Sequence, residues 1–154
     1  MGQTTQTSRD INATPDKIYR ALTDPILLAK WQVPGDMKAK VHYFDLKVGG
    51  GYQMSLFYPD NEVQFTGKTS DKEDRFTAKF VELIPDTKIV VLINFDTADS
   101  NYSGEMTLKV HLQPIDTGTR VTFLFENIPV GIRPEDNEAG TSSSLEKLAR
   151  LVEP

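Results

Sequence analysis

Hydrophobic residues follow two different periods along this chain, and the periods divide it into three regions. Residues 15–31 carry apolar side chains at spacings of three and four, which is typical of helices that bury one face. From residue 38 to residue 127 apolar and polar residues alternate, as in strands with one buried face. After Pro134 the helical period returns. The pattern therefore predicts two helices, then an antiparallel sheet, then a final helix.

The first 35 residues predict a strand followed by two short helices. Residues 4–12 are rich in Thr, which favours a strand. Thr14-Pro15 and Asp24-Pro25 are both helix starts, because Thr or Asp can cap a helix and proline suits its first position. Pro34 and Gly35 end the second helix. The apolar faces are expected at Ile18, Tyr19, Ala21 and Leu22 in the first helix and at Ile26, Leu27, Leu28 and Trp31 in the second.

The alternating region predicts an antiparallel meander of about six or seven strands. Turn residues separate its segments, among them Gly49-Gly50-Gly51 and the acidic stretch 71–74, which is expected to be a solvated hairpin tip. A sheet with one apolar face needs a cover. The residues expected to face inward are Val41/Tyr43, Tyr52/Met54/Leu56/Tyr58, Val63/Phe65, Phe76/Ala78/Phe80, Ile89/Val91/Ile93/Phe95, Met106/Leu108/Val110/Leu112 and Val121/Phe123/Phe125.

The last twenty residues supply that cover. A helix from Pro134 would carry an apolar stripe at Leu145, Leu148 and Val152, and about nineteen residues span roughly 28 Å, the length of a strand. The stretch 140–144 contains weak helix formers, so the helix could be kinked or start late. Residues 134–144 offer the sheet only Ala139 and small polar side chains. Either this end is frayed and solvated, or it forms the small-residue wall of a cavity.

Composition removes several classes of function. The formal net charge of -5 argues against nucleic-acid binding, which needs clustered Lys and Arg. With no Cys and 2 His, a metal site or a thiol nucleophile is not expected, and no cofactor is expected either. No signal peptide and no apolar run of membrane-spanning length is recognisable. These features predict a cytoplasmic protein that binds neither nucleic acid nor a membrane.

Motifs spread along nearly the whole chain also match a known family. They are residues 11–25, Trp31, residues 48–52, Gly67, residues 80–91, residues 118–122, Gly140 and residues 144–148. In these positions the sequence resembles the activator of heat-shock-protein-90 ATPase homologue-like family of the START-like, or SRPBCC, superfamily. The resemblance implies the α+β helix-grip fold, a curved antiparallel sheet wrapped on a long C-terminal helix, as one domain over residues 4–154. The family usually has Trp where this chain has Thr141, which puts any ligand of its relatives in doubt.

Large rings are the most informative side chains for function. The chain has 8 Phe, 5 Tyr and 1 Trp, and apolar clefts with a few polar groups are typical ligand sites. Each ring alone could be ordinary core, but as a set beneath a helix segment with small side chains they indicate an internal pocket. The predicted ligand-binding residues are Trp31, Tyr43, Tyr52, Phe65, Phe80, Phe95, Met106, Phe123, Gly140, Thr141 and Ser144.

Three functions remain open at this point. The first is binding of a small hydrophobic or amphipathic ligand between the sheet and the last helix, by a monomer or weak homodimer. The second, which the resemblance implies, is a co-chaperone-like module in stress response that stimulates a heat-shock ATPase. The third is an enzyme of the cyclase or hydratase kind, which would need a buried ionisable group, with Asp45 as the best candidate. No catalytic residue is assigned, since His42 and His111 both alternate with apolar neighbours and are expected to face solvent.

Overall fold

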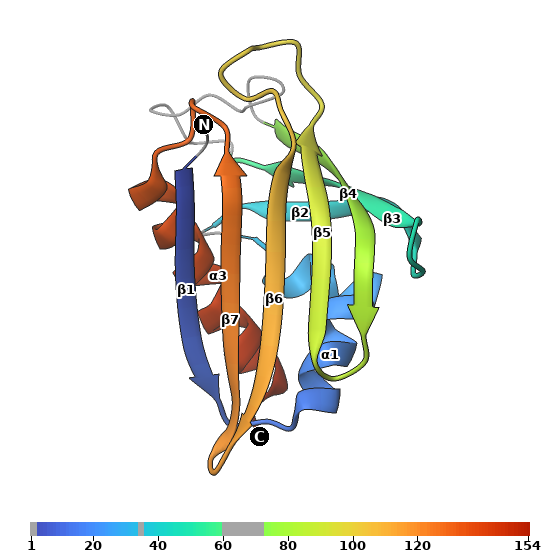
Figure 1. The fold of residues 1–154 in the computed structure, drawn as a ribbon, viewed down its shortest axis with the longest axis vertical. Coiled ribbons are helices and arrows are strands. Elements are labelled where there is room, and N and C mark those ends of the chain that lie inside the picture. The colour runs from blue at the N-terminus through green and yellow to red at the C-terminus, as the bar shows by residue number, and fades with distance from the viewer. Residues whose placement is uncertain (1–2, 34–35, 60–72) are drawn as a thin grey trace.

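A computed structural model describes residues 3–33, 36–59 and 73–154 of the chain. In these ranges it contains one seven-stranded sheet and three helices, the arrangement that the resemblance implies (Figure 1). The elements are β1 (Gln3–Ile11), α1 (Pro15–Thr23), α2 (Pro25–Trp31), β2 (Lys38–Asp45), β3 (Gly51–Phe57), β4 (Glu73–Ile84), β5 (Lys88–Phe95), β6 (Met106–Ile115), β7 (Gly118–Ile128) and α3 (Pro134–Val152). The predicted strand around Val63 and Phe65, and Gly67, lie outside the described residues.

The sheet is antiparallel throughout, with the strand order β1-β7-β6-β5-β4-β3-β2. Strands β2 to β7 form the predicted meander, and β1 joins it beside β7. The helices α1 and α2 carry the chain from β1 to the opposite edge of the sheet. Figure 1 shows α3 running behind β1 and β7, while β2 and β3 cross behind the long strands. The curved sheet thus wraps around a core that α3 and α2 close.

The three helices begin at the predicted prolines. The Asp24 carboxylate caps α2 by accepting hydrogen bonds from the backbone N–H groups of Ile26 and Leu27, at 2.8 and 3.3 Å. Thr14 stands at the N-cap of α1, but its side chain makes no capping bond. Ile26, expected on the buried face of α2, is instead 70% exposed because it points away from the sheet.

The last helix is continuous from Pro134 to Val152, so a kink or a late start at Gly140 is wrong. Tertiary contacts outweigh the weak helix propensity of this stretch, since Thr141 and Ser144 are buried. The Thr141 hydroxyl also donates to the backbone carbonyl of Asn137, one turn earlier, at 2.8 Å. Ala139, expected to face the sheet, is exposed.

A β-bulge in β2 changes which residues face the core. Val41 pairs with Met54 and Tyr43 with Gln53, so that His42 is the extra residue. One inserted residue reverses the alternation beyond it. Phe44 therefore packs against the core, whereas Tyr43 is 50% exposed. The expectation that Tyr43 faces inward with Val41 is wrong for this reason.

The bulge also moves Asp45, the proposed buried acid, to the outer face. Its side chain is 55% exposed and lies 3.7 Å from the Lys47 ammonium. The expected hairpin tip is also different in the described part, because Glu73 and Asp74 belong to β4. Asp74 is only 3% exposed and accepts a hydrogen bond of 3.0 Å from the Tyr58 hydroxyl. The buried acid of this region is therefore Asp74, and not Asp45 as the sequence led us to expect.

Across the described ranges, none of the helices is both long enough and apolar enough to cross a membrane.

Candidate functional site: the space between the sheet and its helices

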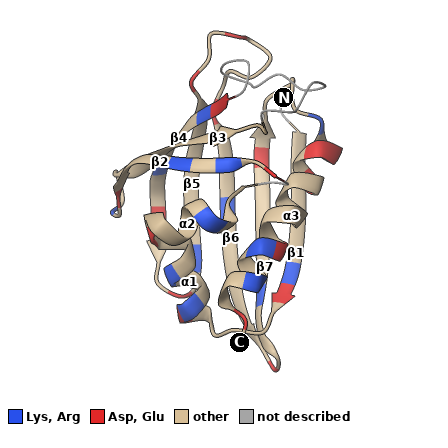
Figure 2. Ribbon diagram, turned by 180° about the vertical axis from the view of Figure 1, so that it is seen from behind, with Lys and Arg blue, Asp and Glu red and all other residues tan. Residues whose placement is uncertain are grey.

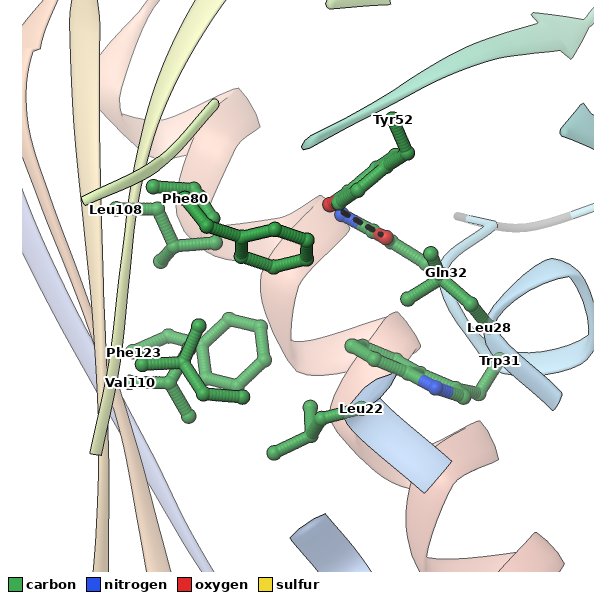
Figure 3. A pocket seen from close by; sticks show the side chains of 11 residues that line it. Leu22, Leu28, Trp31, Gln32, Tyr52, Phe80, Leu108, Val110 and Phe123 are labelled. Atoms are coloured by element: carbon green, nitrogen blue, oxygen red, sulfur yellow. Dashed lines mark hydrogen bonds between the residues drawn. The ribbon is translucent and has the colours of Figure 1, made fainter. Parts of the chain in front are cut away.

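A small cavity lies between the inner face of the sheet and α2 (Figure 3). Its walls include Trp31 and Gln32 from the end of α2, with Tyr52, Phe80 and Phe123 from the sheet. The cavity volume is about 20 Å³. That is room for about one water molecule, whereas sites for small molecules usually measure about 300–1,000 Å³. In this conformation the cavity holds no organic ligand.

One polar contact stands at the edge of this apolar cavity. The Tyr52 hydroxyl donates to the Gln32 side-chain carbonyl at 3.4 Å, drawn as a dashed line in Figure 3. Burial raises the pKa of Tyr52 to about 12, so its hydroxyl stays protonated in the neutral range. The Trp31 indole N–H donates to the backbone carbonyl of Ala21 at 2.8 Å, which fixes the ring against α1. Tyr52 and Gln32 are therefore the groups that could exchange a hydrogen bond with a guest.

Two chains of ring contacts meet at the cavity. One runs along β2 to β5, where Tyr52 stacks on Phe44 with centroids 5.5 Å apart and approaches Phe80 at 5.8 Å. It continues through Phe76 to Phe95 at 6.2 Å. The other chain starts at Trp31, which packs edge-to-face on Phe123 at 5.9 Å, and continues to Phe125 at 6.5 Å.

The chain that ends at Phe125 leads to the N-terminal half of α3. Phe125 pairs across strands with Thr5, and the Thr5 hydroxyl donates to the Asn137 side-chain carbonyl at 2.5 Å. This part of α3 carries only small or polar side chains inward, namely Asn137, Thr141 and Ser144. Phe125 and Phe95, although inward-facing, are only half-buried. The rings here are less completely covered than those around the cavity.

Two loops form the edge of the region beneath the N-terminal half of α3. The loop between β5 and β6 meets the segment that leads into α3, because the Gly131 N–H donates to the Asn101 carbonyl at 2.6 Å. A Cβ on Gly131 would lie 2.7 Å from that carbonyl oxygen, so the close approach requires glycine. The 96–103 loop and the segment before α3 therefore meet at this edge.

The predicted site residues fall into five groups. Trp31, Tyr52, Phe80 and Phe123 meet at the cavity, and Phe95 and Met106 lie further along the same inner face. Gly140, Thr141 and Ser144 belong to α3, where the last two are buried. Tyr43 is on the outer face, and Phe65 lies outside the described residues.

Sequence reasoning missed two rings that contact Tyr52, namely Phe44 and Phe76. It also missed seven residues that line the cavity: Gln32 and the aliphatic Leu22, Leu28, Ile89, Val91, Leu108 and Val110. Phe76 has the right alternation and could have been included. Phe44 is hidden by the bulge at His42, which no local sequence signal announces. Gln32 is polar and follows a helix, so its hydrogen bond with Tyr52 can be recognised only from the tertiary structure.

A polar cluster occupies the outer face of β2, β3 and β4. Ser55, fully buried, donates its hydroxyl proton to the Glu73 carboxylate at 2.5 Å and lies 2.8 Å from His42 Nε2. Since the only hydroxyl proton goes to Glu73, His42 is the donor to Ser55. The Ser55 hydrogen bond, with Arg75 nearby, lowers the pKa of Glu73 below its usual range.

This cluster does not resemble a catalytic arrangement. A nucleophilic serine needs a base that takes its proton and a path to substrate, and Ser55 has neither an accepting histidine nor exposure. The described residues also contain no group of three or more His, Asp or Glu side chains that could hold a metal ion. With Asp45 exposed, the enzyme hypothesis loses the residue on which it depended.

The glycine run Gly49-Gly50-Gly51 lies on the same outer face, beneath a surface hollow beside Tyr43 and Lys79. Gly49 has a φ of 91°, and a Cβ on Gly51 would lie 2.0 Å from the Ala78 carbonyl oxygen. Both observations explain the glycines as turn and strand-packing residues.

The comparisons with known proteins agree with this architecture. The profile described as "Activator of Hsp90 ATPase homolog 1-like protein" matches residues 12–153. No curated protein sequence matches the chain.

Solved structures show how widely the fold is shared. A crystal structure of a protein from Chromobacterium violaceum is 33% identical, covering 98% of this chain and 97% of that one, with a TM-score of 0.87. A protein from Rhodobacter sphaeroides is 17% identical with a TM-score of 0.77, covering 97% and 93%. A protein from Aeromonas hydrophila described as AHSA1-like is 18% identical with a TM-score of 0.71, covering 97% and 92%. At such low identities the last two support the fold alone. The profile match over most of the chain shows that this protein belongs to the Activator of Hsp90 ATPase homolog 1-like family.

Proposed function

We propose that this protein binds a small apolar or amphipathic molecule between its sheet and α3. Membership of the family supports a ligand-binding or co-chaperone-type domain in general. Of these two, ligand binding has a specific observation in its favour. Inward-facing Phe125 stays half-buried beside the part of α3 that carries only small or polar side chains, since it pairs across strands with Thr5, which bonds to Asn137. Apolar surface left accessible inside a fold is what a guest molecule can cover.

The path of such a guest follows the ring contacts. From the cavity beside Trp31 it would pass Phe123 and then Phe125, which leads to Thr141 and Ser144 on α3. Each 100 Å² of apolar surface removed from water would contribute roughly 2.5 kcal/mol before ordering costs. The Tyr52 hydroxyl and the Gln32 amide could take one polar group of the guest.

The cavity must widen for this to occur, because about 20 Å³ admits only water. Helix α2 is the wall best suited to move, since it has seven residues and short helices are marginal by themselves. Leu28, Trp31 and Gln32 of the α2 region all border the cavity. A small outward shift of α2 would enlarge it without disturbing the sheet.

The test is a fluorescence titration with Nile red, a neutral dye that emits strongly in apolar sites. Saturable binding is expected for the unchanged protein. Thr141→Trp should weaken it at least tenfold, because an indole would fill the space under α3. Ser144→Leu fills the same space with a smaller side chain, and it replaces Thr141→Trp if that variant fails to fold.

Ser142→Trp is the matched control. It adds the same indole one position along α3, but Ser142 is exposed, so the affinity should stay within about twofold. Absence of saturable binding by the unchanged protein would refute the proposal. Equal losses in Thr141→Trp and Ser142→Trp would also refute it, because the dye would then bind elsewhere.

A further inference from the structure

Positive charges on the two sides of this molecule have different surroundings. On the outer face of the long strands, each of three cations meets an acid: Lys88 lies 3.1 Å from Glu82, Lys109 2.9 Å from Glu126 and Arg120 2.8 Å from Asp10. These charges are neutralised locally. They leave little net positive potential on that face.

The side that carries the helices is different. Lys17 and Arg20 on α1, Lys30 on α2, and Lys38 and Lys40 on β2 are all exposed. None of the five is within ion-pair distance of a carboxylate in the described part of the chain. Figure 2 shows these segments together on the face seen from behind the sheet. We call these five residues the basic surface.

The basic surface is held together by α2. This helix contacts β2, α1 and α3, so the three elements that carry the five cations are neighbours. Ile26 is one helical turn before Lys30 and is 70% exposed. A large apolar side chain thus stands among unneutralised cations.

We propose that the basic surface binds an acidic segment of a partner protein, with an apolar side chain of that segment covering Ile26. Complementary charge is the argument for the partner's chemistry: the chain has a net charge of -5, yet these five cations form no ion pair with a described carboxylate. A short peptide can follow cations that come from three different elements. This inference is independent of the proposed ligand between the sheet and α3.

Extended polyanions fit the basic surface less well than a short acidic peptide does. Nucleic acid and anionic membranes attract clustered cations, but they also meet the surrounding acids. Asp16, Asp36 and Glu146 lie on or next to the same elements, and the net charge of -5 repels a long array of negative charge. A peptide of limited length avoids most of this repulsion.

The experiment uses a fluorescein-labelled twelve-residue peptide of Glu with one central Leu, titrated by anisotropy at 50 mM and 300 mM salt. Binding that weakens at the higher salt is expected. The triple variant Lys30→Ala, Lys38→Ala, Lys40→Ala should bind about tenfold more weakly, as expected for three exposed ion pairs.

The control triple variant is Lys47→Ala, Lys79→Ala, Lys88→Ala. It loses the same three charges from other parts of the sheet and its turns, so binding should change less than twofold. Equal losses in both variants would show an effect of net charge alone and overturn the proposal. No binding by the unchanged protein would also overturn it. So would binding of phosphatidylserine vesicles or a single-stranded DNA 20-mer in place of the peptide.

Discussion

The two halves of α3 cover the sheet in different ways. The C-terminal half buries Leu145, Leu148, Ala149 and Val152, each at most 3% exposed. The N-terminal half buries Thr141 and Ser144 instead, and it reaches the sheet through the hydrogen bond between Thr5 and Asn137. We call these the apolar half and the polar half of the interface.

The comparison teaches where this fold gets its stability and where it has room for function. Where apolar side chains are closely packed, shortening any one of them lowers the free energy of unfolding. Small polar side chains that bond within their own helix, as Thr141 does, contribute little packing to the sheet. The outer face of the sheet has a polar contact of another kind, between buried Ser55 and Glu73. The apolar half of the α3 interface should therefore be sensitive to cavities, and the contact of Ser55 with Glu73 to polar substitutions and pH.

The largest effect is expected in the apolar half. Leu148→Ala should lower the free energy of unfolding by about 2–5 kcal/mol, because Leu148 is 0% exposed and the space it leaves cannot collapse fully. Urea unfolding followed by Trp31 fluorescence measures this. Leu151→Ala, on the same helix but half-buried, should cost clearly less. Equal losses would mean that burial against the sheet does not determine the result.

The second effect tests the polar contacts through pH. Ser55→Ala should cost about 1–2 kcal/mol at pH 7, because the buried Ser55 hydroxyl donates to the partly buried Glu73 carboxylate. The Ser55 hydroxyl is the main cause of the lowered pKa of Glu73. A lowered pKa stabilises the fold above the unfolded value of about 4.5, and this stability is lost as the pH falls through the folded value.

The difference between the unchanged protein and Ser55→Ala should therefore shrink between pH 5 and pH 3. Urea unfolding at pH 7, 4.5 and 3 measures it. Leu148→Ala is the control, since its cost arises from apolar packing and should change little over the same range. A cost of Ser55→Ala that stayed constant with pH would show that Glu73 is not involved.

The sequence predicts the apolar half much better than the polar half. Helical spacing is a local property, so the prolines at 15, 25 and 134 and the stripe of Leu145, Leu148 and Val152 can be recognised without the fold. The strands of the meander follow from alternation in the same way. The bulge at His42 cannot, because it appears only when β2 is paired with β3.

For the site, the prediction identifies the right rings on the strands and misjudges the volume. Alternation shows that Phe80 and Phe123 face inward, but it does not show how closely their neighbours approach. The cavity is only about 20 Å³ because Tyr52 from β3 meets Trp31 and Gln32 from the end of α2 there. Similarly, Asp74 looks like a turn residue until the position of Tyr58 explains its burial.

The third effect concerns Tyr52 at the cavity. Tyr52→Phe should cost about 0.5–1 kcal/mol, because it removes one long hydrogen bond to Gln32 at 3.4 Å and keeps the ring contacts. Thermal or urea unfolding measures the cost. Phe80→Leu is the comparison, since it removes ring contacts without a hydrogen bond and should cost more. A larger loss from Tyr52→Phe would show that the hydroxyl stabilises the cavity more than its rings do.

The smallest effect should be that of Thr141→Val in the polar half. Valine has nearly the same shape, and the lost hydroxyl bonds only to the Asn137 carbonyl of its own helix, so unfolding should change by no more than about 0.5 kcal/mol. A loss above about 2 kcal/mol would place Thr141 in packing as tight as that of Leu148. The polar half would then have no loosely filled space, and the proposed ligand would lose its position. A near-zero cost combined with stronger Nile red binding would instead show that apolar surface beneath α3 is open to a guest.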